Sequence, residues 1–160
     1  MSYDIITRSI NGLNDPALTL IAQVIDSDFI FTLMVLGLLM LEKDGTKRKK
    51  VFVALLAAFL LTVALKSAFH IQRPCTELLA KIPCPMGYAF PSAHAMVAFT
   101  LAVAFLYRPN YWAYLGFALI VAASRIYLGV HSLEDVAGSL ALSVILYNSI
   151  DHVWRKYHEK

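Results

Sequence analysis

The chain has 160 residues, of which 59% are hydrophobic and only 16% charged, and its formal net charge is +3. Soluble domains usually contain about 45–50% apolar and about 25% charged residues, so this chain is too apolar to face only water. The small net charge gives no support for nucleic-acid binding, and the length fits one domain covering residues 1–160. The expected partner is therefore a lipid bilayer.

The first 14 residues do not have the pattern of a cleavable signal peptide, because Asp4, Arg8 and Asn11 interrupt their apolar residues. The apolar residues of this stretch could share one side of a short helix in the membrane interface: Ile5, Ile6, Ile10 and Leu13. A frayed terminus is the alternative.

Five apolar stretches predict an all-α integral membrane protein, a helical bundle of about five transmembrane helices preceded by the interfacial helix. They cover residues 29–41, 51–68, 95–107, 111–123 and 133–154. Several are shorter than the roughly 20 residues that a spanning helix needs, so polar flanking residues must be included. The first is the weakest, because Asp26 and Asp28 precede it; residues 17–25 form either its outer turn or a separate surface helix.

The orientation follows from the basic residues of the 42–50 loop, which are Lys43, Lys47, Arg48, Lys49 and Lys50. Short basic loops stay in the cytoplasm. This predicts a multi-pass protein of the inner (plasma) membrane whose 73–90 loop faces the periplasm or the exterior.

Both cysteines, Cys75 and Cys84, lie in this outer loop. In an oxidising compartment they could form a disulfide bond, and two unrelated thiols are the alternative. A zinc site is not expected, because two cysteines without further paired ligands fall short of a zinc ligand set.

A first polar cluster ends the second apolar stretch. Lys66 and Arg73 are seven residues apart, so a helix would place both on one side, and Pro74 would end that helix. Arginine presents a planar fork to phosphate oxygens and lysine a compact charge. Alternatively, both side chains only extend to lipid headgroups.

A second cluster, Pro91-Ser92-Ala93-His94, opens the third stretch. Free backbone N–H groups at a helix N-terminus, together with the Ser92 hydroxyl, make an anion site within reach of His94. An ordinary helix cap beside an unrelated histidine is the alternative.

A third cluster runs from Ser124 and Arg125 to His131 and Asp135. Residues four apart share a helix face, and a carboxylate bonded to one imidazole nitrogen leaves the other free to attack. The alternative is a histidine–aspartate pair with a purely structural role. On the predicted topology all three clusters meet at the outer face, where the cations and N–H groups would hold a phosphoryl group between a base and an acid.

These motifs resemble the three-part signature of the type 2 phosphatidic acid phosphatase family: Lys66-x6-Arg73-Pro74, Pro91-Ser92-x-His94, and Ser124-Arg125-x5-His131-x3-Asp135. The resemblance covers residues 66–135 and departs from the family at Ala93, where glycine is usual. It implies that His131 attacks phosphorus, that Asp135 orients His131, and that His94 protonates the leaving group. It also implies a phosphate-binding set of Lys66, Arg73, Ser92, the Ala93 N–H, Ser124 and Arg125, with no metal or other cofactor.

The expected substrate is a lipid phosphate, because the site would open at the membrane surface and the chain has no sizeable soluble headgroup domain. The compact chain, which could accommodate a wide multi-acyl lipid from the side, gives a slight preference for lipid A 1-phosphate. Phosphatidylglycerophosphate and undecaprenyl diphosphate are alternatives, because they offer the same phosphate. Transfer of the phosphoryl group to an acceptor other than water, a small membrane transporter, and a haloperoxidase are competing functions. The polar residues cluster at one face rather than along a path, which disfavours a transporter.

Overall fold

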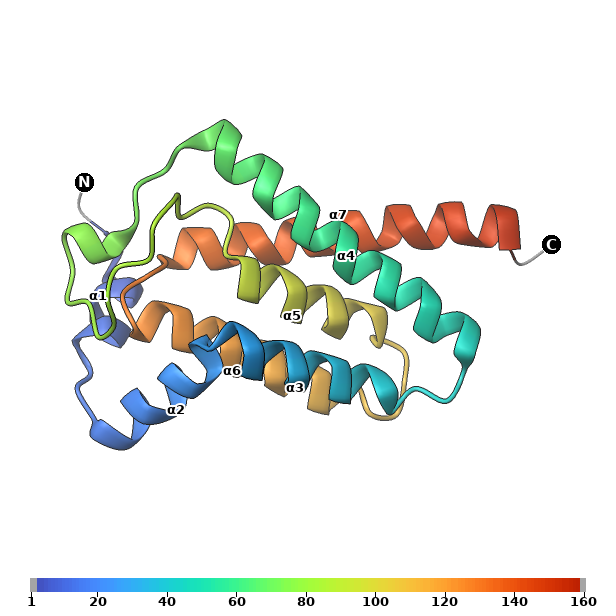
Figure 1. Cartoon of the computed structure of the whole chain (residues 1–160), viewed down its shortest axis with the longest axis horizontal. Helices are drawn as coiled ribbons and strands as arrows, with labels where there is room; N and C mark the ends of the chain where they lie inside the picture. Colours follow the sequence, from blue (N-terminus) through green and yellow to red (C-terminus); the bar gives the residue numbers. More distant parts are fainter. Residues whose placement is uncertain (1–2, 159–160) are drawn as a thin grey trace.

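The computed structural model describes residues 3–158 and is all α in that range. Its helices are α1 (Ile5–Gly12), α2 (Pro16–Asp26), α3 (Asp28–Met40), α4 (Gly45–Phe69), α5 (Ala93–Ala104), α6 (Tyr111–Tyr127) and α7 (Leu133–His158), with a 3-10 turn, η1 (Pro74–Thr76), between α4 and α5. Helices α3, α5, α6 and α7 run roughly along the long axis of the molecule, α4 crosses them obliquely, and α2 turns away from α3 (Figure 1).

Two of these helices, α4 and α7, are long and apolar enough to cross a membrane. Helices α2 and α3 meet the same test only as a pair, bent by 75° around Ser27. Residues 17–25 therefore belong to a helix separate from α3, not to its outer turn, and whether α2 lies at the membrane surface or within a span stays a prediction. Helices α5 and α6 lie in the same bundle but have only 12 and 17 residues. Length and composition therefore support two or three of the five expected spans among the described residues.

Helix α5 lies at the centre of the bundle, packed against α4, α6 and α7 (Figure 1). A helix that is apolar on nearly all sides belongs in a core, and most side chains of α5 are buried. Ala95, Ala98 and Ala102 allow neighbouring backbones to approach closely. The Ser143 hydroxyl of α7 donates a hydrogen bond to the Met96 carbonyl at 2.9 Å. This packing fixes the start of α5 against α7.

Helix α1 docks through its polar side. Thr7 and Asn11 are buried, whereas Ile5 and Ile6 are exposed. Asn11 Nδ2 donates to the carbonyl oxygens of Leu79 and Tyr127, at 2.8 and 3.3 Å. Leu13 is also exposed, but Ile10, expected on the same apolar side, packs against the core. Exposed Ile5, Ile6 and Leu13 fit a helix in a membrane interface, whereas Ile10 does not.

Several helix ends differ from the sequence-based prediction. Asp44 accepts hydrogen bonds from the Thr46 and Lys47 amides, so α4 begins at Gly45 and most of the expected basic loop is helical. At its other end α4 stops at Phe69, because His70 adopts a left-handed conformation (φ 52°). Pro74 therefore begins η1 rather than ending α4.

Candidate active site

The three polar clusters predicted from the sequence meet at one end of the bundle. This end is formed by the C-terminal ends of α4 and α6, the N-terminal ends of α5 and α7, and the 70–90 loop, on the left of Figure 1. The chain brings these segments together because α4 and α6 run toward this end while α5 and α7 run away from it. In the described structure, the three polar clusters therefore converge at one end of the bundle.

His131 and Asp135 form a buried pair. Nδ1 of His131 lies 3.3 Å from Oδ2 of Asp135, and the two side chains are 3% and 4% exposed. The pairing is not made along a helix, as the sequence suggested, because α7 begins only at Leu133. Instead Ser132 and Asp135 cap α7 reciprocally: the Ser132 amide donates to Asp135 Oδ2 at 2.9 Å, and the Asp135 amide donates to the Ser132 hydroxyl at 3.3 Å. The cap holds the carboxylate against the imidazole.

The surroundings of His131 favour the neutral form of its imidazole. Burial is the main cause and lowers the pKa of its imidazole well below the usual value, and the charges of Arg125 and Arg73 lower it further. The hydrogen bond to Asp135 acts in the opposite direction. A neutral imidazole with Nδ1 bonded to a carboxylate carries its nucleophilic lone pair on Nε2.

Arg73 faces Nε2 of His131. Its Nη1 lies 3.3 Å from His131 Nε2 and donates to the Val130 carbonyl, also at 3.3 Å. Arg73 lies outside α4, so it does not share a helix side with Lys66; the backbone turn at His70 brings it to the site instead. The glycine at position 129 permits the sharp turn before His131, with φ of 76° and the Leu79 carbonyl 2.5 Å from where a Cβ would lie.

Lys66 is held by the loop that precedes α5. Its Nζ donates to the carbonyl oxygens of Tyr88 and Ala89, and Nε of Arg73 donates to the neighbouring Gly87 carbonyl. Both cations are thus tied to the same short segment, 87–89. In the structure Cys75 and Cys84 form a disulfide bond in this loop, with Cα atoms 5.7 Å apart.

The start of α5 presents donors toward the same place. Ser92 is the N-cap, and its buried hydroxyl makes no cap hydrogen bond and has no other partner. Ala93 is the first helical residue, so its N–H belongs to the first turn, whose amides lack intrahelical partners. The Ser92 amide donates to Ser139 Oγ of α7 at 3.0 Å, which fixes this helix end. Pro91 lies just before the N-cap residue Ser92.

His94 has unexpected partners from α3. Its Nε2 lies 3.7 Å from Oδ1 of Asp28, and its ring packs against Phe31 with ring centroids 4.3 Å apart. No hydrogen bond satisfies Nε2, although the atom is buried. His70, set aside in the sequence analysis, packs edge-to-face against Tyr88 and is exposed.

Arg125 connects the clusters. Its carbonyl accepts from the His131 amide at 3.3 Å, and its charge acts on both His94 and His131. One nitrogen of the guanidinium, Nη1, forms an ion pair with Asp26, and Nε is buried without a partner. Ser124 differs, because its hydroxyl donates to the Val121 carbonyl of its own helix at 2.7 Å.

Four contributing residues were missed by the sequence analysis: Asp26, Asp28, Phe31 and Ser132. The spacing Ser132-x-x-Asp135 before an apolar stretch is a capping signal, so Ser132 could have been found. Nothing local to residues 26–31 indicates a contact with residues 94 and 125, because these pairs exist only in the folded bundle.

An apolar cavity of about 480 Å³ adjoins the site between α3, α4 and α5. His94, Ala93 and Asp28 line it at one end, and the rest of its lining is apolar apart from Thr32. Phe52, Leu56 and Phe59 of α4 are exposed along this side. The cavity could hold a hydrocarbon chain whose polar end reaches His94.

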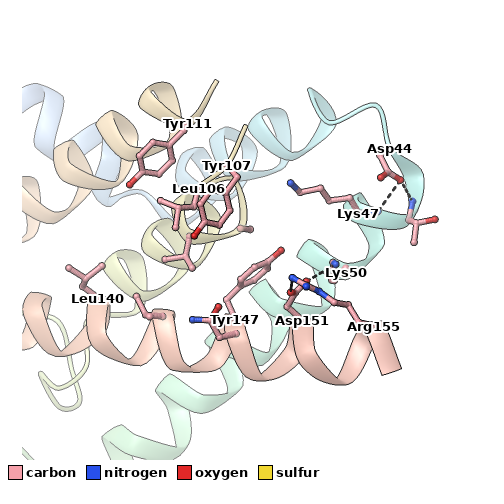
Figure 2. Close-up of a pocket in the computed structure, with 15 residues that line it drawn as sticks. Asp44, Lys47, Lys50, Leu106, Tyr107, Tyr111, Leu140, Tyr147, Asp151 and Arg155 are labelled. Atoms are coloured by element: carbon pink, nitrogen blue, oxygen red, sulfur yellow. Dashed lines mark hydrogen bonds and ion pairs between the residues drawn. The ribbon is translucent and has the colours of Figure 1, made fainter. Parts of the chain in front are cut away.

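A separate cavity of about 520 Å³ lies at the opposite end of the bundle, where Asp151 of α7 pairs with Lys50 and Arg155 (Figure 2). No residue of the three predicted clusters lines it. Within residues 3–158 no group of three or more histidine, cysteine, aspartate or glutamate side chains is arranged to hold a metal ion.

A family model described as "PAP2 superfamily" matches residues 49–158. YbjG of Escherichia coli (strain K12), provisionally named as an undecaprenyl-diphosphatase, is 30% identical over 116 residues, which cover 69% of this chain and 59% of that protein. The undecaprenyl-diphosphatase of Sulfolobus acidocaldarius is 32% identical over 118 residues, 65% of this chain and 56% of that protein. The chain thus matches little more than half the length of these relatives. The crystal structure of Aquifex aeolicus LpxE has the same fold, with a TM-score of 0.75, 23% identity, and coverage of 92% of this chain and 93% of that one.

Proposed function

This chain belongs to the PAP2 superfamily, and on that premise we propose that it is an integral membrane lipid phosphatase that works through a phosphohistidine without a metal ion. The proposed substrate is a lipid phosphate, and the proposed site is the end of the bundle where the three polar clusters meet.

The observation that carries the proposal is a set of three buried polar atoms without partners, one from each of three residues in that site. They are Ser92 Oγ, His94 Nε2 and Arg125 Nε. Buried polar groups normally have hydrogen-bond partners, and unsatisfied ones often mark a functional site. A phosphate group offers acceptor oxygens to all three. Lys66, Arg73 and the first amides of α5 would complete an anion site with three cations, which supply the charge neutralisation that a metal ion supplies elsewhere.

The first step follows from the His131 geometry. Nε2 of His131 attacks phosphorus, and the bond from phosphorus to the lipid oxygen breaks as its electron pair moves onto that oxygen. Asp135 keeps the attacking nitrogen in the correct tautomer and stabilises the positive charge that develops on the imidazole. Arg73, 3.3 Å from Nε2, is placed to hold a phosphate oxygen beside the nucleophile.

His94 completes both half-reactions in this mechanism. In the first it gives a proton to the departing lipid oxygen. In the second it takes a proton from a water molecule, whose oxygen attacks phosphorus while the P–N bond breaks. Inorganic phosphate leaves and His131 returns to its neutral form. Protons and electron pairs therefore balance over one turnover.

A lipid substrate is supported by the apolar cavity that ends at His94 and by the apolar helices around it. We propose that α5 and α6 cross the bilayer together with α4, α7 and the bent α2–α3 pair, and that α1 lies in the interface. On the basis of the basic residues 43–50 we place the active site on the periplasmic or exterior side of the inner (plasma) membrane.

Among lipid phosphates, lipid A 1-phosphate is the proposed substrate, with phosphatidylglycerophosphate and undecaprenyl diphosphate as alternatives. The Escherichia coli and Sulfolobus acidocaldarius relatives are both named as undecaprenyl-diphosphatases, which supports undecaprenyl diphosphate among these alternatives. Transfer of the phosphoryl group to an alcohol is the competing reaction, and it would use the same phosphohistidine.

The test is release of inorganic phosphate by the purified protein in detergent from a panel of these lipids under identical conditions. We expect His131→Ala to abolish release, and His152→Ala, an exposed histidine near the far end of α7, to leave it unchanged. EDTA should have no effect, and vanadate, which mimics five-coordinate phosphorus, should inhibit. Substantial turnover by His131→Ala would exclude His131 as the nucleophile, and loss of turnover with EDTA would contradict the metal-free mechanism.

A further inference from the structure

The position of Asp28 bears on the chemical class of the leaving group. In phosphoryl transfer the attacking and leaving atoms lie roughly in line on opposite sides of phosphorus. With His131 as nucleophile and His94 as acid, which rests on the function proposed above, the leaving oxygen lies at His94. The chemical group that joins this oxygen to the lipid therefore lies among the residues that surround His94.

The surroundings of His94 on the cavity side are apolar and acidic. Asp28 lies 3.7 Å from His94 Nε2, and Asp28 and His94 are the only ionisable residues that line the cavity among those described. No lysine or arginine lines it. Among the described residues, the cation whose charge acts on His94 is Arg125, whose Nη1 forms an ion pair with Asp26. The charged groups facing His94 are thus Asp28 and Asp26 from the α2–α3 break and Arg125 from α6.

The two possible classes of lipid substrate differ at this point. A phosphate monoester releases an uncharged alcohol, so only apolar or neutral atoms follow the leaving oxygen. A lipid diphosphate releases a lipid monophosphate, whose negatively charged phosphorus group would lie between His94 and the hydrocarbon chain. That phosphate would face the Asp28 carboxylate without a lysine or arginine lining the cavity beside it.

We propose that Asp28 is a specificity-determining residue that selects lipid monophosphates over lipid diphosphates by electrostatic repulsion of a charged leaving group. The Asp28 side chain is exposed in the free protein, where water screens its charge. A lipid chain in the cavity covers it and excludes that water, so the repulsion acts when substrate is bound. Asp28 also lies outside the part of the chain that matches the family model, residues 49–158. The preference thus belongs to the α2–α3 break of this chain and not to the shared catalytic motifs.

The experiment compares the monophosphate and the diphosphate of one polyprenol, so that the hydrocarbon chain is constant. Phosphate release gives kcat/KM for each lipid with the wild type, Asp28→Asn, which removes the charge, and Asp28→Glu, which keeps it. Asp44→Asn, which changes a carboxylate at the opposite end of the bundle, is the matched control.

We expect the wild type to prefer the monophosphate by about tenfold or more, the size of one uncompensated charge contact in a partly screened site. Asp28→Asn should reduce that preference to about threefold or less, mainly by raising kcat/KM for the diphosphate. Asp28→Glu and Asp44→Asn should retain the wild-type preference. A wild type that prefers the diphosphate, or an unchanged ratio in a folded Asp28→Asn, would overturn the role of Asp28. Release from neither lipid would instead overturn the phosphatase function itself.

Discussion

The guanidinium of Arg125 forms an ion pair with the carboxylate of Asp26, which lies 99 residues earlier in the chain. The Arg125 side chain is 4% exposed and that of Asp26 26%. A buried cation needs a partner whether or not a phosphate is bound, and Asp26 supplies one from the break between α2 and α3. The bent α2–α3 pair therefore contributes a residue to the candidate active site, although the family model begins only at residue 49.

Asp26→Ala should destabilise the protein by about 3 kcal/mol, because removal of one partner leaves the other charge buried and uncompensated. The melting temperature in detergent measures this loss. Vanadate should restore part of it, because an anion in the site would neutralise Arg125. Equal melting temperatures for wild type and variant without vanadate would show that water already solvates Arg125.

Asp135→Asn should reduce kcat by about 10³–10⁴-fold, by analogy with the aspartate of serine hydrolase triads, because the amide no longer enforces the reactive tautomer of His131. Ser132→Ala should cost less than Asp135→Asn, since it removes the hydroxyl of the α7 cap and leaves the Asp135 carboxylate beside the imidazole. The loss of kcat in each variant is measured by steady-state kinetics with a lipid monophosphate. Equal losses of kcat in the two variants would mean that the loss comes from disruption of the α7 cap and not from removal of the Asp135 carboxylate.

His131 should stay neutral in mildly acidic solution, because burial lowers its pKa below the usual value of about 6.5. The neutral form is the nucleophile and exists above the pKa, so a lowered pKa extends the active range toward acid. ¹⁵N spectra of the histidine-labelled protein report the charge directly, and the signal lost in His131→Asn identifies the residue. A His131 imidazole that is mostly protonated at pH 6 would contradict the expectation.

The same pKa shift affects stability in a defined direction. Below about pH 6.5 the unfolded chain binds a proton at His131 that the folded chain excludes. The contribution of this residue to the free energy of unfolding is therefore constant above that pH and becomes unfavourable as the pH falls. His131→Asn should consequently lose less stability than the wild type between pH 6.5 and pH 5.

Replacement of both Cys75 and Cys84 by serine should lower the free energy of unfolding by about 2–3 kcal/mol, the chain-entropy value for a loop of this length. It should also raise KM more than it lowers kcat, because segment 87–89 of the same 70–90 loop holds Lys66 and Arg73 in place. Melting curves and kinetics without reductant give both quantities. An unchanged KM would show that segment 87–89 keeps its position without the disulfide.

The sequence predicted the helices better than it predicted their ends. Apolar stretches identify α3 to α7 because a buried or lipid-facing helix must be apolar over most of its length. The ends depend on single residues, such as the Asp44 cap and the left-handed His70, whose effects override the surrounding pattern. The His131–Asp135 contact was predicted from helical spacing, whereas the structure makes it through the α7 cap.

The residues of the candidate site also form two groups: those that could be proposed from the sequence and those that could not. The residues proposed to do the chemistry lie in three short motifs, and the resemblance of these motifs to a known family was enough to propose their roles, which stay predictions. Asp26, Asp28 and Phe31 could not be named, because their role depends on a 75° bend that brings them to α5 and α6.

By itself, then, the sequence determined an apolar helical chain with three polar motifs that resemble those of a phosphatase family, because composition and local spacing are written in consecutive residues. Only the tertiary structure decided how Arg125 is neutralised, what surrounds His94, and which nitrogen of His131 faces Arg73. Those contacts join residues far apart in the chain, and they arise from the packing of α3, α4, α6 and α7 around α5 rather than from any local preference.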